Sequence, residues 1–260
     1  MKLLKKIGED SKYIPGIYNY CDRWCERCPF TSRCLNFEMR EEKFDDLESV
    51  DIFDETFWEK LSETLDETLD ILKEMAEEQG IDLYSFDMQE YKTLKKRSNE
   101  KTVVHILSRM SKTYIILVDD WFDLNSCLFE HNKDGIETKS PPHEILSPPK
   151  KDTVTVIDSI EVIRWYQHQI YIKLKRALQS AHDEQFEILN DLPKDSDGST
   201  KVALIGMDRS ISAWGEISKY FSDQRKYIIR IIRYLERLRK ITENQFPDAR
   251  AFVRPGFDEN

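Results

Sequence analysis

The sequence predicts an all-α protein, a helical bundle of five or six helices with an N-terminal four-cysteine metal-binding knuckle. Charged residues make up 34% of the 260 residues and only eight are glycine, a composition that favours helices over a turn-rich β architecture. Apolar residues recur at helical spacing in several long segments. Four of the five cysteines fall within fourteen residues, which in an otherwise cysteine-poor chain indicates a metal site.

Two segments differ in composition from the rest of the chain. Residues 1–40 are rich in cysteine and aromatic side chains and are predicted to form a metal-binding head, followed by the helical bundle over residues 41–260. Residues 131–153 contain four prolines and are predicted to form an extended loop, because proline does not continue a helix. This loop is the candidate for a sub-domain boundary within the bundle.

The first predicted helix lies within the acidic segment 41–80. Its apolar residues follow helical spacing, at Trp58, Leu61, Leu65, Leu69, Leu72 and Met75. Asp54 is expected to cap the amino end of this helix, with Phe53 and Trp58 as a hydrophobic staple. Gly80 is expected to end it, because glycine readily adopts the left-handed conformation just past a helix C-terminus.

A second helix is predicted over about residues 101–124. A three-four alternation of apolar side chains runs through it without a miss, at Val103, Leu107, Met110, Tyr114, Leu117 and Trp121. The run TYIILV within this segment is also compatible with a buried strand, but the period of the flanking residues favours a helix.

Three further helices are predicted, at about residues 156–182, 201–221 and 223–244. Their inward-facing residues are expected to be Ile160, Ile163, Ile170, Leu174 and Ala177, then Ala203, Met207, Trp214, Ile217 and Phe221, then Ile228, Ile231, Leu235 and Leu238. Residues 191–199, DLPKDSDGS, are predicted to form a turn-forming loop. Ser222 is expected to cap the last helix after a short kink.

The net charge of −10 indicates that neither nucleic acid nor an anionic membrane is a general partner of this protein. The sequence contains no run of eighteen apolar residues that could span a bilayer. The amino terminus, MKLLKKIGEDSKY, is positively charged but lacks the apolar core of a signal peptide. We therefore expect a cytoplasmic protein that works with an unidentified protein or redox partner.

The clustered cysteines Cys21, Cys25, Cys28 and Cys34 have the spacing C-x3-C-x2-C-x5-C. In a reducing cytoplasm they are expected to be metal ligands rather than disulfides. A helical Cys21–Cys28 segment would separate its two end residues by about 10.5 Å along the helix axis. Zinc requires thiolates that converge around bonds of about 2.3 Å, whereas an iron–sulfur cubane accepts more widely spaced ligands. A helix here therefore favours a [4Fe–4S] cluster, and a loop restores zinc as an alternative.

The residues around these cysteines suit either metal. Aromatic side chains could wall the site from water, namely Tyr18, Tyr20, Trp24, Phe30 and Phe37. Arginines could offset the negative charge of four thiolates, namely Arg23, Arg27 and Arg33. The sequence thus predicts a [4Fe–4S] cluster first and zinc as the alternative, with unligated or disulfide-forming cysteines as the third possibility.

The stretch CERCPFTSRC, residues 25–34, resembles the iron–sulfur cysteine staple of CRISPR-associated and RecB-like exonucleases. The resemblance implies that Cys25, Cys28 and Cys34 are cluster ligands, with Cys21 as the fourth. It covers about ten residues of the chain. In those nucleases the cysteine triplet lies near the carboxyl end of the nuclease fold, whereas here all four cysteines lie at the amino end. The resemblance therefore supports a cluster and not a nuclease activity.

A second candidate site lies on the helices predicted for the bundle. Glu161 and His168 are two turns apart on one helix face with Arg164 between them, and Asp208 lies beside apolar residues of the next helix. Convergence of Glu161, His168 and Asp208 would create a polar pocket that an enzyme could use. A buried Arg164–Asp208 ion pair that orients His168 is the structural alternative.

The sequence therefore predicts what this protein binds better than what it does. The leading hypothesis is a metalloprotein whose [4Fe–4S] cluster serves electron transfer, redox sensing or stabilisation of a helical scaffold. The alternatives are a zinc-stapled interaction or scaffold protein without catalysis and an enzyme that uses the bundle pocket. The fifth cysteine, Cys127, is expected to be a small buried hydrophobic residue.

Overall fold

The structure is a computed structural model. The described residues are 12–44, 66, 69–70, 73–74, 76–78, 80, 88–126, 150–183 and 194–258. The chain divides into two compact units, one of residues 1–96 with 254–260 and one of residues 97–253. The predicted division after residue 40 and the predicted boundary in residues 131–153 remain predictions.

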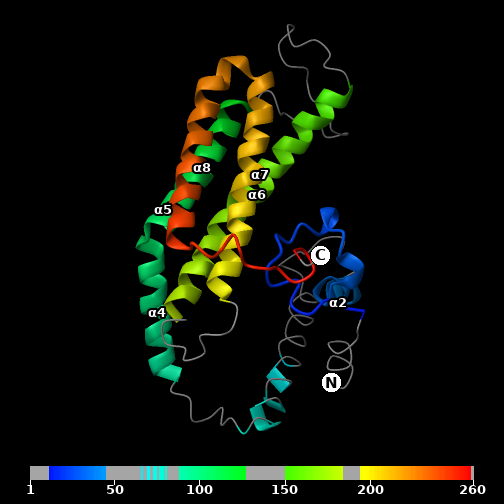
Figure 1. The fold of residues 1–260 in the computed structure, drawn as a ribbon, viewed down its shortest axis with the longest axis vertical. Coiled ribbons are helices and arrows are strands. Elements are labelled where there is room, and N and C mark those ends of the chain that lie inside the picture. The colour runs from blue at the N-terminus through cyan, green and yellow to red at the C-terminus, as the bar shows by residue number, and fades with distance from the viewer. Residues whose placement is uncertain are drawn as a thin grey trace. The chain divides into compact units, whose positions relative to one another are not determined.

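Every regular element in the described ranges is a helix, which confirms the all-α class (Figure 1). The second unit is built on four long helices, α5 (Ile106–Leu124), α6 (Lys150–Asp183), α7 (Asp195–Tyr220) and α8 (Arg225–Gln245). Helix α6 packs against α5 and α7, and α8 packs against the same two helices, so the four close into a ring. Helices α7 and α8 run antiparallel beside each other in Figure 1, joined by the 3-10 turn Ser222–Gln224. This arrangement is a four-helix bundle.

The core of the bundle contains the apolar residues that the helical periodicity predicted. Two tryptophans lie at its centre, where the rings of Trp121 and Trp214 meet edge to face at 5.0 Å. The indole of Trp214 donates a hydrogen bond of 3.2 Å to the hydroxyl of Tyr114. Other predicted residues that are buried are Leu107, Met110, Ile163, Ile170, Leu174, Ala177, Ala203, Met207, Ile217, Ile228, Ile231, Leu235 and Leu238. Leu117, Ile160 and Phe221 are only half-buried.

Helices α6 and α7 approach closely because α7 carries a glycine at their contact. A Cβ atom on Gly206 would lie 2.8 Å from Cδ1 of Tyr166, whose ring is buried on α6. That separation is too short for two carbon atoms in van der Waals contact. Gly206 therefore permits the short distance between α6 and α7. Its role is this close packing and not flexibility of α7.

The prediction of one continuous helix over residues 101–124 is wrong. Two helices occupy it, α4 (Met88–Val104) and α5, separated by His105 in an extended conformation (φ −61°, ψ 144°). The Nδ1 atom of His105 accepts a hydrogen bond of 3.2 Å from the backbone N–H of Leu107 and so caps α5. Val103 at the end of α4 is 39% exposed rather than buried. Sequence analysis does not predict this break, because no glycine or proline occurs near His105.

Protonation of His105 is expected to destabilise the bundle. Burial lowers the pKa of His105 below its ordinary value, and the cap requires an unprotonated Nδ1. The stability that this cap contributes is therefore complete above the ordinary pKa of about 6.5 and is lost as the pH falls through the lower pKa of the folded state. Urea unfolding at several pH values should show a smaller acid dependence in His105→Asn, which caps without titrating. An identical dependence in both proteins would refute this role.

Helices α6 and α7 both begin earlier than predicted. The last four residues of the predicted 131–153 loop belong to α6, and residues 195–199 belong to α7 rather than to a loop. Asp195 explains the second difference, because its carboxylate accepts hydrogen bonds from Arg176 (Nε, 3.1 Å) and Ser180 (2.6 Å), both on α6. Packing against α6 thus overrides the turn preference of the sequence DSDGS.

The predictions for the helix ends are confirmed at Gly80 and wrong at Ser222. Gly80 has a φ of +67°, and its N–H bonds to the carbonyl of Glu77 at 3.2 Å, so it ends its helix as predicted. The short kink before α8 is confirmed, but Ser222 does not cap α8, whose N-cap is Gln224 without a side-chain hydrogen bond. The predicted cap at Asp54 with its staple lies outside the described residues. No described helix is both long and apolar enough to cross a membrane.

Candidate metal centre

The four clustered cysteines lie in the first unit, on and around two 3-10 turns: Cys25 begins the first turn, Cys28 and Cys34 each follow one, and Cys21 lies in a bend. Of the two conformations considered for Cys21–Cys28, the α-helix that would favour a cluster does not form, because only residues Cys25–Arg27 form a helical element, a single 3-10 turn. Before it the chain reverses at Arg23, whose φ of 58° is the only positive value for a non-glycine residue in the described ranges. A left-handed residue of this kind costs about 1–2 kcal/mol. The carboxylate of Asp22 supports the turn by accepting the N–H of Trp24 at 3.2 Å.

The second half of the cluster leads directly into helix α2 (Leu35–Phe44). A second 3-10 turn, Thr31–Arg33, ends at Cys34, whose N–H bonds to the carbonyl of Thr31 at 3.1 Å. The carbonyl of Cys34 in turn accepts the N–H groups of Phe37 and Glu38, both at 3.1 Å, which starts α2. Cys34 is thereby held by backbone bonds on both sides.

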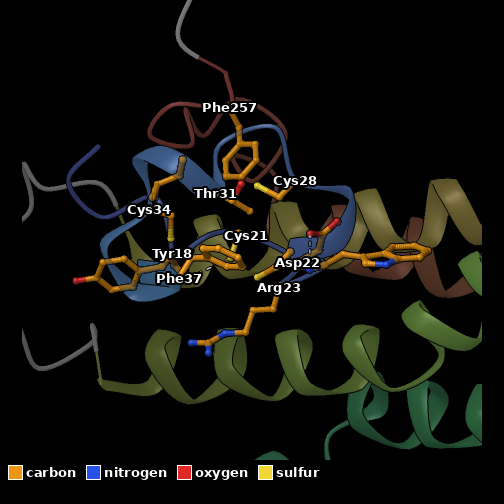
Figure 2. Close-up of a pocket in the computed structure, with 12 residues that line it drawn as sticks. Tyr18, Cys21, Asp22, Arg23, Cys28, Thr31, Cys34, Phe37 and Phe257 are labelled. Atoms are coloured by element: carbon orange, nitrogen blue, oxygen red, sulfur yellow. Dashed lines mark hydrogen bonds between the residues drawn. The ribbon is translucent and has the colours of Figure 1, made fainter. Parts of the chain in front are cut away.

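All four predicted cysteines line one pocket (Figure 2). Each of the four is a free thiol and is half-buried. The rest of the lining is Ile17, Tyr18, Asp22, Arg23, Trp24, Thr31, Phe37 and Phe257. Figure 2 shows Cys21, Cys28 and Cys34 around the pocket together with Tyr18, Phe37 and Phe257. The structure thus brings the predicted ligands to a common space.

The thiols interact electrostatically with one another. Burial raises the pKa of Cys25 above its ordinary value, and the thiols of Cys21 and Cys28 add to this effect while the charge of Arg40 opposes it. Burial likewise raises the pKa of Cys28, which Cys21 and Cys34 reinforce. The N–H of Phe30 has the opposite effect and lowers the pKa of Cys28, because it donates a hydrogen bond of 3.4 Å to the sulfur. A metal ion would take the place of the protons on these thiols, since thiolates are the ligating form.

Three of the five predicted aromatic residues line the pocket, namely Tyr18, Trp24 and Phe37. Phe30 does not line it but packs edge to face against Phe257 at 5.1 Å. Of the predicted arginines, only Arg23 lines the pocket. Arg27 stacks 4.1 Å over the ring of Trp24, and Arg33 donates to the carbonyl of Lys12 at 3.4 Å.

Phe257 reaches the pocket from the carboxyl end of the chain, more than 220 residues after Cys34. Gly256 permits this approach, because its φ is +74° and a Cβ there would lie 2.9 Å from Cδ1 of Ile14. The guanidinium of Arg254 bonds to the carboxylate of Asp258 at 2.9 Å and closes the turn. No signal in the sequence connects this segment with the cysteines, so sequence analysis missed Phe257.

Replacing Phe257 by alanine is expected to expose the thiols. The ring contributes to the apolar lining of the pocket, so its removal should raise the rate at which iodoacetamide alkylates Cys28 in metal-free, reduced protein by a few-fold. Peptide mass spectrometry measures this rate for each cysteine separately. Val253→Ala is the matched control, because Val253 is exposed and does not line the pocket. Equal rates in Phe257→Ala and the unmodified protein would show that the ring does not shield the thiols.

The donor set fits a metal centre, although the thiols are not placed at coordination distance. Four cysteine sulfurs without other ligands are the donors used by both [4Fe–4S] clusters and structural zinc. Within the described part of the chain, no three Cys, His, Asp or Glu side chains converge closely enough to hold an ion where they stand. Binding would therefore require the side chains of the four cysteines to turn inward.

The second candidate site does not assemble as the sequence suggested. Glu161, Arg164 and His168 are exposed on α6. Arg164 bonds to Asp119 at 3.0 Å and not to Asp208, and it stacks 3.7 Å over the ring of Phe122. The predicted Arg164–Asp208 pair is therefore wrong, and nothing places Asp208 beside His168.

Asp208 belongs instead to an ion-pair network. Its carboxylate accepts from Arg239 at 2.9 Å and from Arg250 at 2.6 Å, and Arg250 also bonds to Glu243 at 2.8 Å. Burial raises the pKa of Asp208, but the hydrogen bonds from Arg250 and Arg239 outweigh it, so the pKa is lowered overall. This network joins α7, α8 and the segment that follows α8, which is a structural role.

Comparisons with protein-family models, with curated proteins and with solved structures give no significant match to this chain.

Proposed function

We propose that Cys21, Cys25, Cys28 and Cys34 bind a [4Fe–4S] cluster and that the protein is a metalloprotein built around this centre. The observation that supports the proposal is the shared pocket, which four thiols from a fourteen-residue segment line together with aromatic side chains. When bound, such a cluster supplies one-electron transfer. Its use would be electron transfer to a redox partner, redox sensing, or stabilisation of the helical scaffold.

Features of the pocket are consistent with this use. The N–H of Phe30 donates to the sulfur of Cys28, and hydrogen bonds to ligand sulfurs raise the reduction potential of iron–sulfur clusters. The rings of Tyr18, Phe37 and Phe257 would limit the access of water, which also tunes the potential. Arg23 in the lining and Arg40 near Cys25 would offset part of the thiolate charge.

Structural zinc is the second candidate, favoured by the local backbone. The argument for a cluster from helical spacing does not apply, because the Cys21–Cys28 segment is not an α-helix. The 3-10 turn that brings Cys25 and Cys28 together, with the Cys28 N–H bonded to the Cys25 carbonyl at 3.1 Å, could equally present two sulfurs to one ion. If the site binds zinc, the protein would be a zinc-stapled interaction or scaffold protein without catalysis.

Metal and sulfide analysis of protein purified without oxygen separates the two candidates. The cluster predicts a brown protein with about four irons and about four sulfides per chain. Zinc predicts a colourless protein that holds one zinc and loses stability on chelation. A colourless protein with one tightly held zinc would reject the cluster. A protein that holds neither metal would reject both candidates.

A further inference from the structure

Helix α8 carries a continuous row of exposed positive charges, which we call the basic strip. Its members, Lys226, Arg230, Arg233, Arg237 and Lys240, are all exposed. They follow one another at intervals of four, three, four and three residues, so they lie within a sector of about 80° on the helix surface. From first to last the basic strip extends about 21 Å along the helix axis.

Among the described residues, the positive charges of the basic strip are not paired with carboxylates of the bundle. No ion pair in the described part of the chain involves any of the five side chains. The neighbouring cation of α8, Arg239, is engaged with Asp208 and lies on a different face. Acidic residues next to the strip along the chain are Asp223 before α8 and Glu236 and Glu243 on it, and Glu243 is bonded to Arg250. Asp120 of α5 acts on Tyr227 near the start of the strip.

The opposite face of α8 determines what kind of partner the strip can take. Ile228, Ile231, Leu235 and Leu238 are fully buried in the bundle. Helix α8 therefore cannot turn an apolar face into a bilayer or into the groove of another protein. A partner would therefore contact the row of cations only, because the apolar side of α8 is buried in the bundle.

We propose that the basic strip binds the phosphodiester backbone of a nucleic acid, independently of base sequence. A linear polyanion matches a linear row of cations better than a planar membrane does. Three of the five residues are arginines, whose guanidinium groups pair with phosphate through two parallel hydrogen bonds. This inference is independent of the metal centre.

The net charge of the chain does not exclude this interaction. The whole protein carries −10, but α8 has seven Lys or Arg and two Glu. At physiological ionic strength the Debye length is about 8 Å, so carboxylates farther away than that are largely screened at the strip. The expectation from total charge therefore concerns general binding, whereas the proposal concerns one face of one helix.

Salt dependence of binding to a labelled single-stranded oligonucleotide tests the proposal directly. Five phosphate contacts predict a slope of log K against log salt of about −3.5, which is a loss of about 100-fold between about 50 and about 200 mM salt. The full-length Arg233→Gln/Arg237→Gln variant should bind more weakly, with a slope of about −2.1 and a loss of about 20-fold over the same range. Fluorescence anisotropy measures both, and RNA, DNA and duplex versions of the oligonucleotide identify which backbone is preferred.

A charge-matched control separates the strip from general electrostatics. Lys112→Gln/Arg209→Gln also removes two positive charges, but both residues lie against tyrosines of α6. This variant should keep the slope of the unmodified protein. The proposal is overturned if no oligonucleotide binds at low salt, or if both double variants weaken binding equally. Equal strip-dependent binding to polyglutamate or to phosphatidylserine vesicles would also overturn it.

Discussion

Replacing Cys28 by serine is expected to abolish stoichiometric metal binding. Cys28 lies in the middle of the cysteine cluster, and its thiol interacts electrostatically with those of Cys21 and Cys34. A serine hydroxyl is not deprotonated near neutral pH and is a poor ligand for both iron–sulfur clusters and zinc. The variant should also lose the metal-dependent part of its stability, about 3 kcal/mol where free metal stands 100-fold above its dissociation constant. Metal analysis and chemical unfolding measure the two effects.

The fifth cysteine supplies the control for this experiment. Cys127→Ser makes the same chemical change in a cysteine that is distant from the cluster in sequence and lies outside the described residues, so it should keep the full metal content. If Cys28→Ser retained as much metal as Cys127→Ser, the clustered thiols would not be the ligands. Loss of metal in both variants at equal levels would point to general instability rather than to ligation.

Replacing Trp214 by alanine is expected to cost the bundle about 3–5 kcal/mol of unfolding free energy. Trp214 is fully buried on α7 and meets the ring of Trp121 at 5.0 Å. Its removal leaves a large cavity between α5 and α7 and takes away the hydrogen bond to Tyr114. Because Tyr114 is fully buried, its hydroxyl would lose a partner that it cannot replace by water without a rearrangement. Urea unfolding followed by circular dichroism measures the loss.

Trp214→Phe tests which part of the tryptophan matters. Phenylalanine keeps most of the apolar contact and loses only the indole donor, so it should cost clearly less than alanine. The two compact units offer a second check. All residues that line the cysteine pocket belong to the first unit and Trp214 to the second, so folded Trp214→Ala should keep the metal content that the proposed function predicts. Equal costs for both substitutions would mean that packing around Trp214 is not what stabilises the bundle.

The helical core was predictable because it depends on a periodic signal that tertiary contacts reinforce. Leu235 and Leu238 on α8, like Met207 and Ile217 on α7, are buried where the three-four spacing placed them. Each such residue recurs on one helix face, and a bundle needs one apolar face from every helix. The all-α class follows from the same regularity.

The remaining features depend on single contacts that leave no periodic trace. The break at His105 rests on one side-chain cap, and the early start of α7 rests on the bonds of Asp195 to α6. Spacing identified all four cysteines of the pocket, but not the backbone that carries them, because the left-handed Arg23 has no sequence signature comparable to glycine. The contribution of Phe257 depends on chain topology, which one sequence does not reveal.

The central claim is that Cys21, Cys25, Cys28 and Cys34 act together as ligands of one inorganic centre. The most direct measurement is a residue-by-residue alkylation map of the native protein, purified without oxygen, before and after metal removal. We expect the four thiols to resist alkylation together while metal is bound and to react together once it is released. Four thiols that react one by one at unrelated rates, with no metal lost in step, would contradict the account.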